Sequence, residues 1–272
     1  MELDDIRAHW QGWAEQFKGD IRATTKTPTI KLLEIDALKR AIEKIAGTDG
    51  AQSILEVGCG NGHNCIALSK FFPQTHFTGV DYIGDMVKCA LDNRDAQQAT
   101  EQADFYEGNV LDLDSHAELT GEYDIAFTDR CLINLNSVEL QLQGLAQIAH
   151  QVKIGGHVIL IENINDSYSQ QNALREHAGL AARTPDKFNL FFNESELTEG
   201  AKPHLQLVRS ENFASLHDIM LYVITPMVSG KVDYESPYVK AVTDMLLSLP
   251  DGLHDSFGGF GQNRLYVFRR TQ

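Results

Sequence analysis

Few cysteines are present, and none of them stands in a metal-binding pattern. The 272 residues include 4 cysteines, at positions 59, 65, 89 and 131, with no C-x-x-C pair and no zinc spacing. Such isolated thiols are typical of small buried side chains in a reducing compartment. The sequence therefore predicts neither a disulfide framework nor a metal site.

Basic charge and long apolar runs are also scarce. Lys and Arg number 23 against 38 Asp and Glu, a net charge of −15, and the basic residues are scattered. This balance disfavours nucleic acid as a partner. The N-terminal "MELDDIRAHW" has no apolar core, and the run "HVILI" at 157–161 is too short to span a bilayer. We expect no membrane partner and a cytoplasmic location.

Short apolar runs alternate with amphipathic segments through the middle of the chain. This pattern predicts a doubly wound, mostly parallel α/β sheet with helices on both faces. The expected strands are 53–57, 76–80, 103–108, 123–128, 157–162 and 264–270. The expected helices are 64–72, 84–94, one from Ser137 ended by Gly155-Gly156, and 236–249.

The two ends of the chain differ from this middle part. Residues 1–50 are expected to form a helical cap, in which one helix runs from Thr27-Pro28 to Gly47. Another helix carries Trp10, Trp13 and Phe17, and it either packs on the body of the protein or acts as a lid. Residues 51–163 would form the cofactor-binding core. Residues 164–272 would complete the sheet and add substrate-cap elements, with a helical 164–200 and two candidate strands in 204–213 and 216–224.

A glycine-rich turn follows the first expected strand. It reads G-x-G-x-G at Gly58, Gly60 and Gly62, whereas a dinucleotide fingerprint needs its third glycine at position 63, which is His63. Asp81 ends the second expected strand, where a carboxylate can accept both hydroxyls of a ribose. The turn therefore favours a nucleoside ligand other than a nicotinamide dinucleotide and disfavours an oxidoreductase.

The segments "ILEVGCGNG", "FTGVDYIGDMVKCA", "FYEGNVLDL", "YDIAFTDRCLINL" and "VKIGGHVILIEN" together resemble class I S-adenosylmethionine-dependent methyltransferases. The resemblance covers residues 50–163 and implies a seven-stranded sheet and S-adenosylmethionine as cofactor. Asn109 stands where the family usually has Asp, and Ile154 where it usually has Pro. By this resemblance the cofactor would contact Glu56, Gly58, Cys59, Gly60, Gly62, Asp81, Tyr82, Met86, Asn109, Val110 and Asp129.

The methyl acceptor is expected near the loop 128–137 and the following strand end. We predict catalytic roles for Asp129, Arg130 and His177, the last as a general base. Glu162 is a further candidate there. Arg22 or Lys26 would meet a substrate carboxylate if the loop 22–27 closes over the pocket. An ion pair between Asp129 and Arg130, and a solvated helix face for His177, are the competing interpretations. The predicted substrate contacts are Arg130, Asn134, Asn163 and Tyr168.

These features favour transfer of a methyl group to oxygen or nitrogen of a small molecule, such as a metabolite, a sugar or a natural-product intermediate. The alternatives are a protein or RNA methyltransferase and a non-catalytic S-adenosylmethionine-binding protein. The sequence leaves the oligomeric state open, with a homodimer as one option.

Overall fold

A computed structural model describes residues 1–48, 50–119 and 121–272, and its centre is one seven-stranded sheet. The strand order is β3-β2-β1-β4-β5-β7-β6. The first five strands pair in parallel, and β7 is antiparallel to both β5 and β6. The strands are β1 Ser53–Val57, β2 His76–Asp81, β3 Ala103–Glu107, β4 Tyr123–Asp129, β5 Val152–Asn163, β6 Leu205–Glu211 and β7 Asn263–Arg270.

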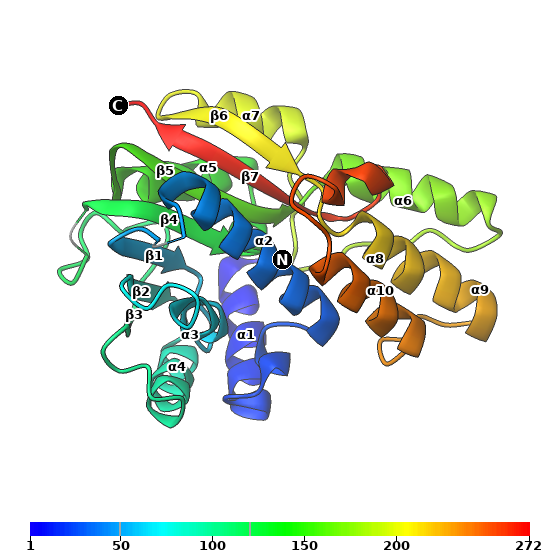
Figure 1. The fold of residues 1–272 in the computed structure, drawn as a ribbon, viewed down its shortest axis with the longest axis horizontal. Helices are drawn as coiled ribbons and strands as arrows, with labels where there is room; N and C mark the ends of the chain where they lie inside the picture. Colours follow the sequence, from blue (N-terminus) through cyan, green and yellow to red (C-terminus); the bar gives the residue numbers. More distant parts are fainter. Residues whose placement is uncertain (49, 120) are drawn as a thin grey trace.

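Helices cover both faces of this sheet, and two groups of helices extend beyond it (Figure 1). The long helix α2 crosses one face, whereas α1 packs beside α4. The elements α8, η3, α9 and α10 gather at one end of the molecule. The helices are α1 Leu3–Phe17, α2 Pro28–Ala46, α3 His63–Ser69, α4 Gly84–Ala96, α5 Val138–His150, α6 Asn165–His177, α7 Glu194–Ala201, α8 Ser215–Ile219, η3 Met220–Ile224, α9 Thr225–Ser229 and α10 Pro237–Leu247.

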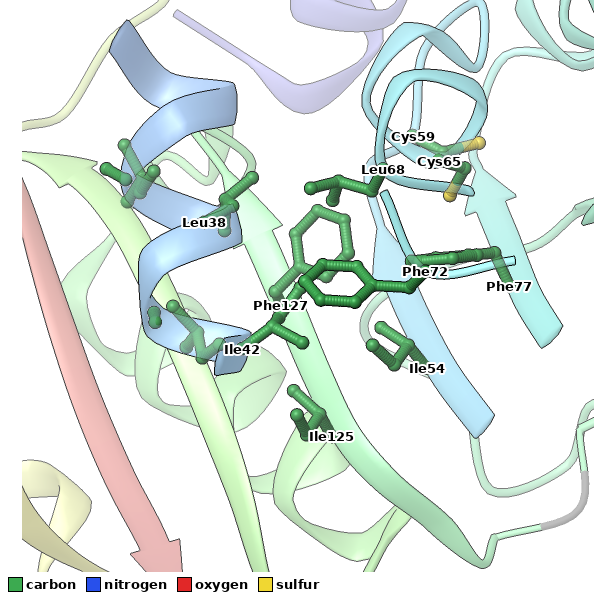
Figure 2. Close-up of a cluster of buried hydrophobic side chains, with 14 of the residues drawn as sticks. Leu38, Ile42, Ile54, Cys59, Cys65, Leu68, Phe72, Phe77, Ile125 and Phe127 are labelled. Atoms are coloured by element: carbon green, nitrogen blue, oxygen red, sulfur yellow. The ribbon is translucent and has the colours of Figure 1, made fainter. Parts of the chain in front are cut away.

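Alternation along the strands builds a separate core on each face. Ile125 and Phe127 of β4 pack with α2, α3 and α10, whereas Ala126 between them packs on the α5 side. Figure 2 shows the first core, where Leu38 and Ile42 of α2 face Phe127 and its neighbours. Burial on both faces explains why the central strands read as continuous apolar runs rather than alternating ones.

The seven-stranded, mostly parallel sheet predicted from the sequence is confirmed, and so is a helix from Pro28 that ends at Gly47. Two local predictions are wrong. The pair Gly155-Gly156 does not end a helix but lies inside β5, at a register irregularity opposite β4, where Gly155 has a φ of +85°. Residues 216–224 are helical rather than a strand. A short apolar run does not distinguish a buried helix from a buried strand.

The described part of the chain contains no helix that is both long and apolar enough to cross a bilayer.

Candidate functional site

A cavity of about 400 Å³ opens at the carboxyl ends of the parallel strands, where ligands of doubly wound sheets bind. One part of its wall comes from the turns after β1, β2 and β3. Another part comes from the turn after β4 and from the segments that follow β5. Helix α1, the loop 24–27 and the loop 183–191 supply the remaining walls.

The glycine turn after β1 has a backbone that side chains would disrupt. Gly58 and Gly60 line the cavity, with φ values of +77° and +52°. A Cβ atom on Gly58 would lie 2.6 Å from the Cys131 Sγ atom, and one on Gly60 would lie 2.6 Å from the Thr24 Cγ2 atom. Glycine is therefore required at both positions by conformation and by space. The result is a bare backbone surface on one wall of the cavity.

Asp81 closes the next strand and faces the same cavity. Its Oδ2 accepts from the Gly60 backbone N–H at 2.8 Å, and its Oδ1 accepts from the Ile83 N–H at 2.9 Å. Each carboxylate oxygen has a second lone pair, so the group still has two acceptor positions. Burial raises the pKa of Asp81, although both backbone hydrogen bonds oppose that rise.

Four further residues predicted at this end also line the cavity: Tyr82, Met86, Asn109 and Val110. Tyr82 is 43% exposed, and the guanidinium of Arg7 on α1 lies 4.6 Å from its ring centroid. The Asn109 Oδ1 atom accepts from the Leu111 N–H at 2.9 Å, which turns the chain after β3. Next to Asp81, the cavity wall therefore consists of apolar side chains and one amide side chain.

Glu56, Cys59 and Gly62 do not line the cavity, although the sequence predicted cofactor contacts for them. Glu56 lies beneath the turn and accepts from Asn64 Nδ2 at 2.7 Å and from Cys65 Sγ at 3.0 Å. Burial raises the pKa of Glu56 to about 8. Because its oxygens already have partners inside the protein, Glu56 supports the turn from below.

Helix α1 covers the cavity and is hydrogen-bonded to the rest of the site at its middle and after its C-terminal end. Trp10 and Trp13 line it, and Trp10 Nε1 donates to Asn134 Oδ1 at 3.1 Å. After the helix, the carbonyls of Lys18 and Asp20 accept from Asn61 Nδ2 at 3.0 and 2.8 Å. The segment that leads out of α1 is thus hydrogen-bonded to the glycine turn itself.

A buried charge network underlies the wall formed by β4. Lys31 of α2 binds Asp129 and lies 2.8 Å from Glu34 Oε2, while Arg130 Nε lies 3.0 Å from Glu34 Oε1 and 3.5 Å from Asp129 Oδ1. Asn64 Nδ2 also donates to Asp129 at 3.0 Å. Two cations thereby neutralise two carboxylates that are almost fully buried.

This network decides what Asp129 and Arg130 can do. Burial by itself would raise the pKa of Asp129, but the nearby charges of Lys31 and Arg130 outweigh it, and the pKa is lowered. A carboxylate held ionised in this way is a poor proton acceptor. Arg130 has a φ of +60° and is committed to Glu34 and Asp129, so it is not free to bind a substrate anion. The structure therefore favours the ion-pair interpretation over the predicted catalytic roles.

Glu162 and His177 are the remaining candidate bases. Glu162 accepts from the Leu132 N–H at 3.0 Å and from Thr128 Oγ1 at 2.9 Å, and its pKa is raised by burial to about 7. It holds the turn after β4 and does not line the cavity. His177 is on the exposed last turn of α6, where its Nδ1 lies 2.8 Å from the Ala173 carbonyl. The helix places His177 outside the residues that line the cavity, so nothing in the structure supports its predicted role as general base.

A family model described as a methyltransferase domain matches residues 48–206, which is more than half of the chain. The chain belongs to this methyltransferase family. It is 30% identical over 94 residues to malonyl-[acyl-carrier protein] O-methyltransferase from Bacillus cereus, across 35% of this chain and 32% of that protein. The chain thus spans about a third of the length of this curated relative.

Solved structures share the methyltransferase fold over nearly the whole chain. A chain in the complex between the Haloferax volcanii Trm112 methyltransferase activator and a putative methyltransferase matches with a TM-score of 0.60, 17% identity and 98% coverage of both chains. Magnesium protoporphyrin IX methyltransferase from Synechocystis PCC 6803 with bound SAH, S-adenosylhomocysteine, matches with a TM-score of 0.55, 15% identity and coverage of 88% and 83%.

The family and the class I fold assign S-adenosylmethionine as the cofactor of this methyltransferase domain. The residues present fit that molecule. Gly58 and Gly60 bring backbone without side chains to the cavity wall, and Asp81 retains acceptor positions for ribose hydroxyls. The cavity volume of about 400 Å³ lies within the range of about 300–1,000 Å³ that is usual for small-molecule sites.

The sequence interpretation missed several residues of the methyltransferase site. Lys31 and Glu34 read as parts of an ordinary amphipathic helix, and their i,i+3 spacing was the available signal of an ion pair. The loop 183–191 and Tyr222 carry no motif, and only the fold brings them to the cavity. Asn134, Asn163 and Tyr168, predicted as substrate contacts, do line it.

Proposed function

We propose that the protein is an S-adenosylmethionine-dependent methyltransferase that methylates oxygen or nitrogen of a small molecule. One observation carries this proposal. A single cavity is lined both by Gly58, Gly60 and Asp81 and by Asn134, Asn163 and Tyr168. Gly58, Gly60 and Asp81 lie at the ends of β1 and β2 on one side of β4. Asn163 and Tyr168 lie at and after the end of β5 on the other side, and Asn134 follows β4 itself, so a cofactor and an acceptor would meet over the end of β4.

The cover over the cavity supports a small acceptor rather than a polymer. Helix α1, the loop 24–27 and the loop 183–191 contribute Trp10, Trp13, Lys26 and Phe188 to its walls. Phe188 stacks on His9 with ring centroids 4.1 Å apart, which joins the loop to α1. The net charge of −15 disfavours RNA as the substrate. We retain the cytoplasmic location as a prediction.

The residues of this chain would act mainly by positioning and by excluding water. When bound, S-adenosylmethionine supplies an electrophilic methyl group on a sulfonium. Asp81 would orient the nucleoside, and Trp10 with Asn134 would hold the cover against the end of β4. Holding two reactants in line supplies much of the rate advantage of a displacement. Asp129 is kept ionised and paired, so we assign it a positioning role in the floor of the site.

Isothermal titration with S-adenosylhomocysteine tests the cofactor site. Asp81→Ala should weaken binding at least about tenfold, because charge-assisted hydrogen bonds to hydroxyl groups are lost. Asp104→Ala is the matched control, since Asp104 lies on β3 and outside the cavity. Equal affinity of the two variants, at matched thermal stability, would refute the site.

Transfer of labelled methyl groups tests the acceptor class. The protein is incubated with methyl-labelled S-adenosylmethionine and either the low-mass or the macromolecular fraction of a cell extract. We expect label in low-mass products. Label in protein or RNA alone would contradict the proposal. Tight binding of S-adenosylhomocysteine with no transfer to either fraction would support the non-catalytic alternative.

A further inference from the structure

Arg183 is a cavity-lining cation without an acidic partner in the part of the chain that the structure describes. Among the described residues no carboxylate lies within 4.0 Å of its guanidinium, whereas Arg130 in the same cavity is paired. Arg183 Nη1 donates to Gln171 Oε1 at 2.6 Å and to Gln262 Oε1 at 3.1 Å. These neutral acceptors orient the guanidinium without neutralising its charge.

Tyrosine rings hold this guanidinium in a defined orientation. The Arg183 Cζ atom lies 3.4 Å from the Tyr222 ring centroid and 5.2 Å from that of Tyr168. Tyr222 belongs to the π-helical segment η3, and such segments are frequent at functional sites. Its carbonyl accepts from the buried Arg175, which also lacks an ion pair in the described structure and raises the local positive charge.

The hydroxyl of Tyr168 is an independent sign of an absent ligand. Tyr168 lines the cavity and is only 5% exposed, and its hydroxyl has no hydrogen-bond partner among the residues that the structure describes. A buried hydroxyl without a partner costs free energy unless a ligand or water satisfies it. Beside Arg183, this hydroxyl is a donor for an anionic oxygen.

The acids of this wall are already satisfied. Asp218 accepts from the Gln262 N–H at 2.9 Å and lies 2.9 Å from His217 Nδ1. Asp186 faces Lys26 at 3.6 Å. Among the described residues, neither acid lies within 4.0 Å of the Arg183 guanidinium. An incoming anion would meet a guanidinium that no described carboxylate contacts directly.

This subsite lies apart from the nucleoside end of the cavity. Tyr168 follows β5 and Asp81 ends β2, and β1 and β4 lie between those strands. Three strand spacings of about 4.8 Å separate β2 from β5 by about 14 Å, and Tyr168 lies in α6, beyond the end of β5. Trp10, Trp13, Phe188 and Phe191 supply aromatic walls in the same cavity. An apolar body reaching from one site toward the other would lie against these rings.

We propose that Arg183 and the Tyr168 hydroxyl bind the carboxylate of the methyl acceptor, and that the acceptor has an aromatic or similarly apolar body. This inference rests on the proposed function, since it concerns the acceptor half of the same cavity. The guanidinium offers a charge-assisted donor pair, and the tyrosine hydroxyl adds a third donor. The carboxylate anchors the acceptor at the end of the cavity away from the cofactor, which leaves its other end for methylation.

Intrinsic fluorescence gives a direct assay, because the only 2 tryptophans of the sequence, Trp10 and Trp13, both line the cavity. Protein saturated with S-adenosylhomocysteine is titrated with 3-phenylpropanoate and with the neutral 3-phenylpropanamide. The acid should give a saturable change and bind at least about tenfold more tightly than the amide. Phenyl phosphate is titrated in parallel. If it binds more tightly than the acid, the site is one for a phosphate group, and the carboxylate assignment is overturned.

Two variants and a control locate the effect. Arg183→Met should lower the affinity for 3-phenylpropanoate at least about tenfold. The affinities for the amide and for S-adenosylhomocysteine should stay unchanged. Tyr168→Phe should lower the affinity for 3-phenylpropanoate by a smaller factor. Arg94→Met is the control, because Arg94 pairs with Asp95 and Asp104 outside the cavity.

The outcomes separate this inference from the proposed function. No saturable response to the acid, equal affinity for acid and amide, or an unchanged acid affinity in Arg183→Met would each overturn the carboxylate site. Loss of S-adenosylhomocysteine binding in Arg183→Met would instead assign Arg183 to the cofactor. Failure of the unmodified protein to bind S-adenosylhomocysteine would refute the proposed function itself.

Discussion

Lys31 is the cation on which the buried charge network of the site depends most. Its side chain is 4% exposed; it binds Asp129 and lies 2.8 Å from Glu34. The side chains of these two acids are 1% and 0% exposed, respectively. Lys31→Met keeps the length and removes the charge, which leaves one cation, Arg130, for two buried carboxylates. Breaking a buried pair by removing one partner costs about 3–5 kcal/mol.

We expect a loss near the lower end of that range, about 3 kcal/mol, because Arg130, Asn64 and Asn263 continue to bind the two acids. For a chain of this size such a loss lowers the melting temperature by about 6–12 °C. Urea unfolding followed by circular dichroism gives the free energy, and differential scanning fluorimetry gives the melting temperature.

Lys153→Met is the matched control. Lys153 lies 2.9 Å from Asp124, but the two side chains are 43% and 30% exposed, so the loss should be about 0–1 kcal/mol. The double variant Lys31→Met/Glu34→Gln should recover part of the stability, because one carboxylate then remains for one arginine. Equal losses in the Lys31 and Lys153 variants would refute the reasoning.

Two further predictions concern Glu56, which lies beneath the glycine turn, and Gly62, which belongs to it. The unfolded chain ionises Glu56 above about pH 4.3, whereas the folded protein retains that proton up to about pH 8, so this group lowers stability as pH rises between those values. The free energy of unfolding of Glu56→Gln should therefore rise relative to that of the unmodified protein by up to about 1.4 kcal/mol per pH unit over that window. Urea unfolding at several pH values measures this difference. A difference that does not depend on pH would contradict the raised pKa of Glu56. Gly62→Ala should destabilise by about 1–3 kcal/mol, because φ is +79° and its Cβ would lie 2.8 Å from Phe105 Cζ. Gly12→Ala within α1 has open space and should instead stabilise by about 0.5–1 kcal/mol, and a loss of similar size in both variants would refute the conformational argument.

The fold was predictable because its signals are local. Apolar runs of strand length and the cap at Ser137 each depend on neighbours within a few residues, and the Ser137 side chain does accept from the Leu140 N–H. The errors fell where local pattern is ambiguous. The run 216–224 is apolar without a clear period, and Gly155-Gly156 suits a helix end as well as a strand irregularity.

The sequence by itself determined the sheet, the glycine turn and the placing of three predicted cofactor residues at one edge of the sheet. Residues 58, 60 and 81 sit at strand ends, and the order of parallel strands brings such ends to one edge. Tertiary structure alone decided the acceptor end. Whether Arg130 or Arg183 is free depends on which carboxylates lie within about 4 Å, and Glu34 reaches Arg130 across 96 residues of chain. Contacts over that separation are set by packing of α2 on the sheet, because no local pattern encodes which partner an arginine meets.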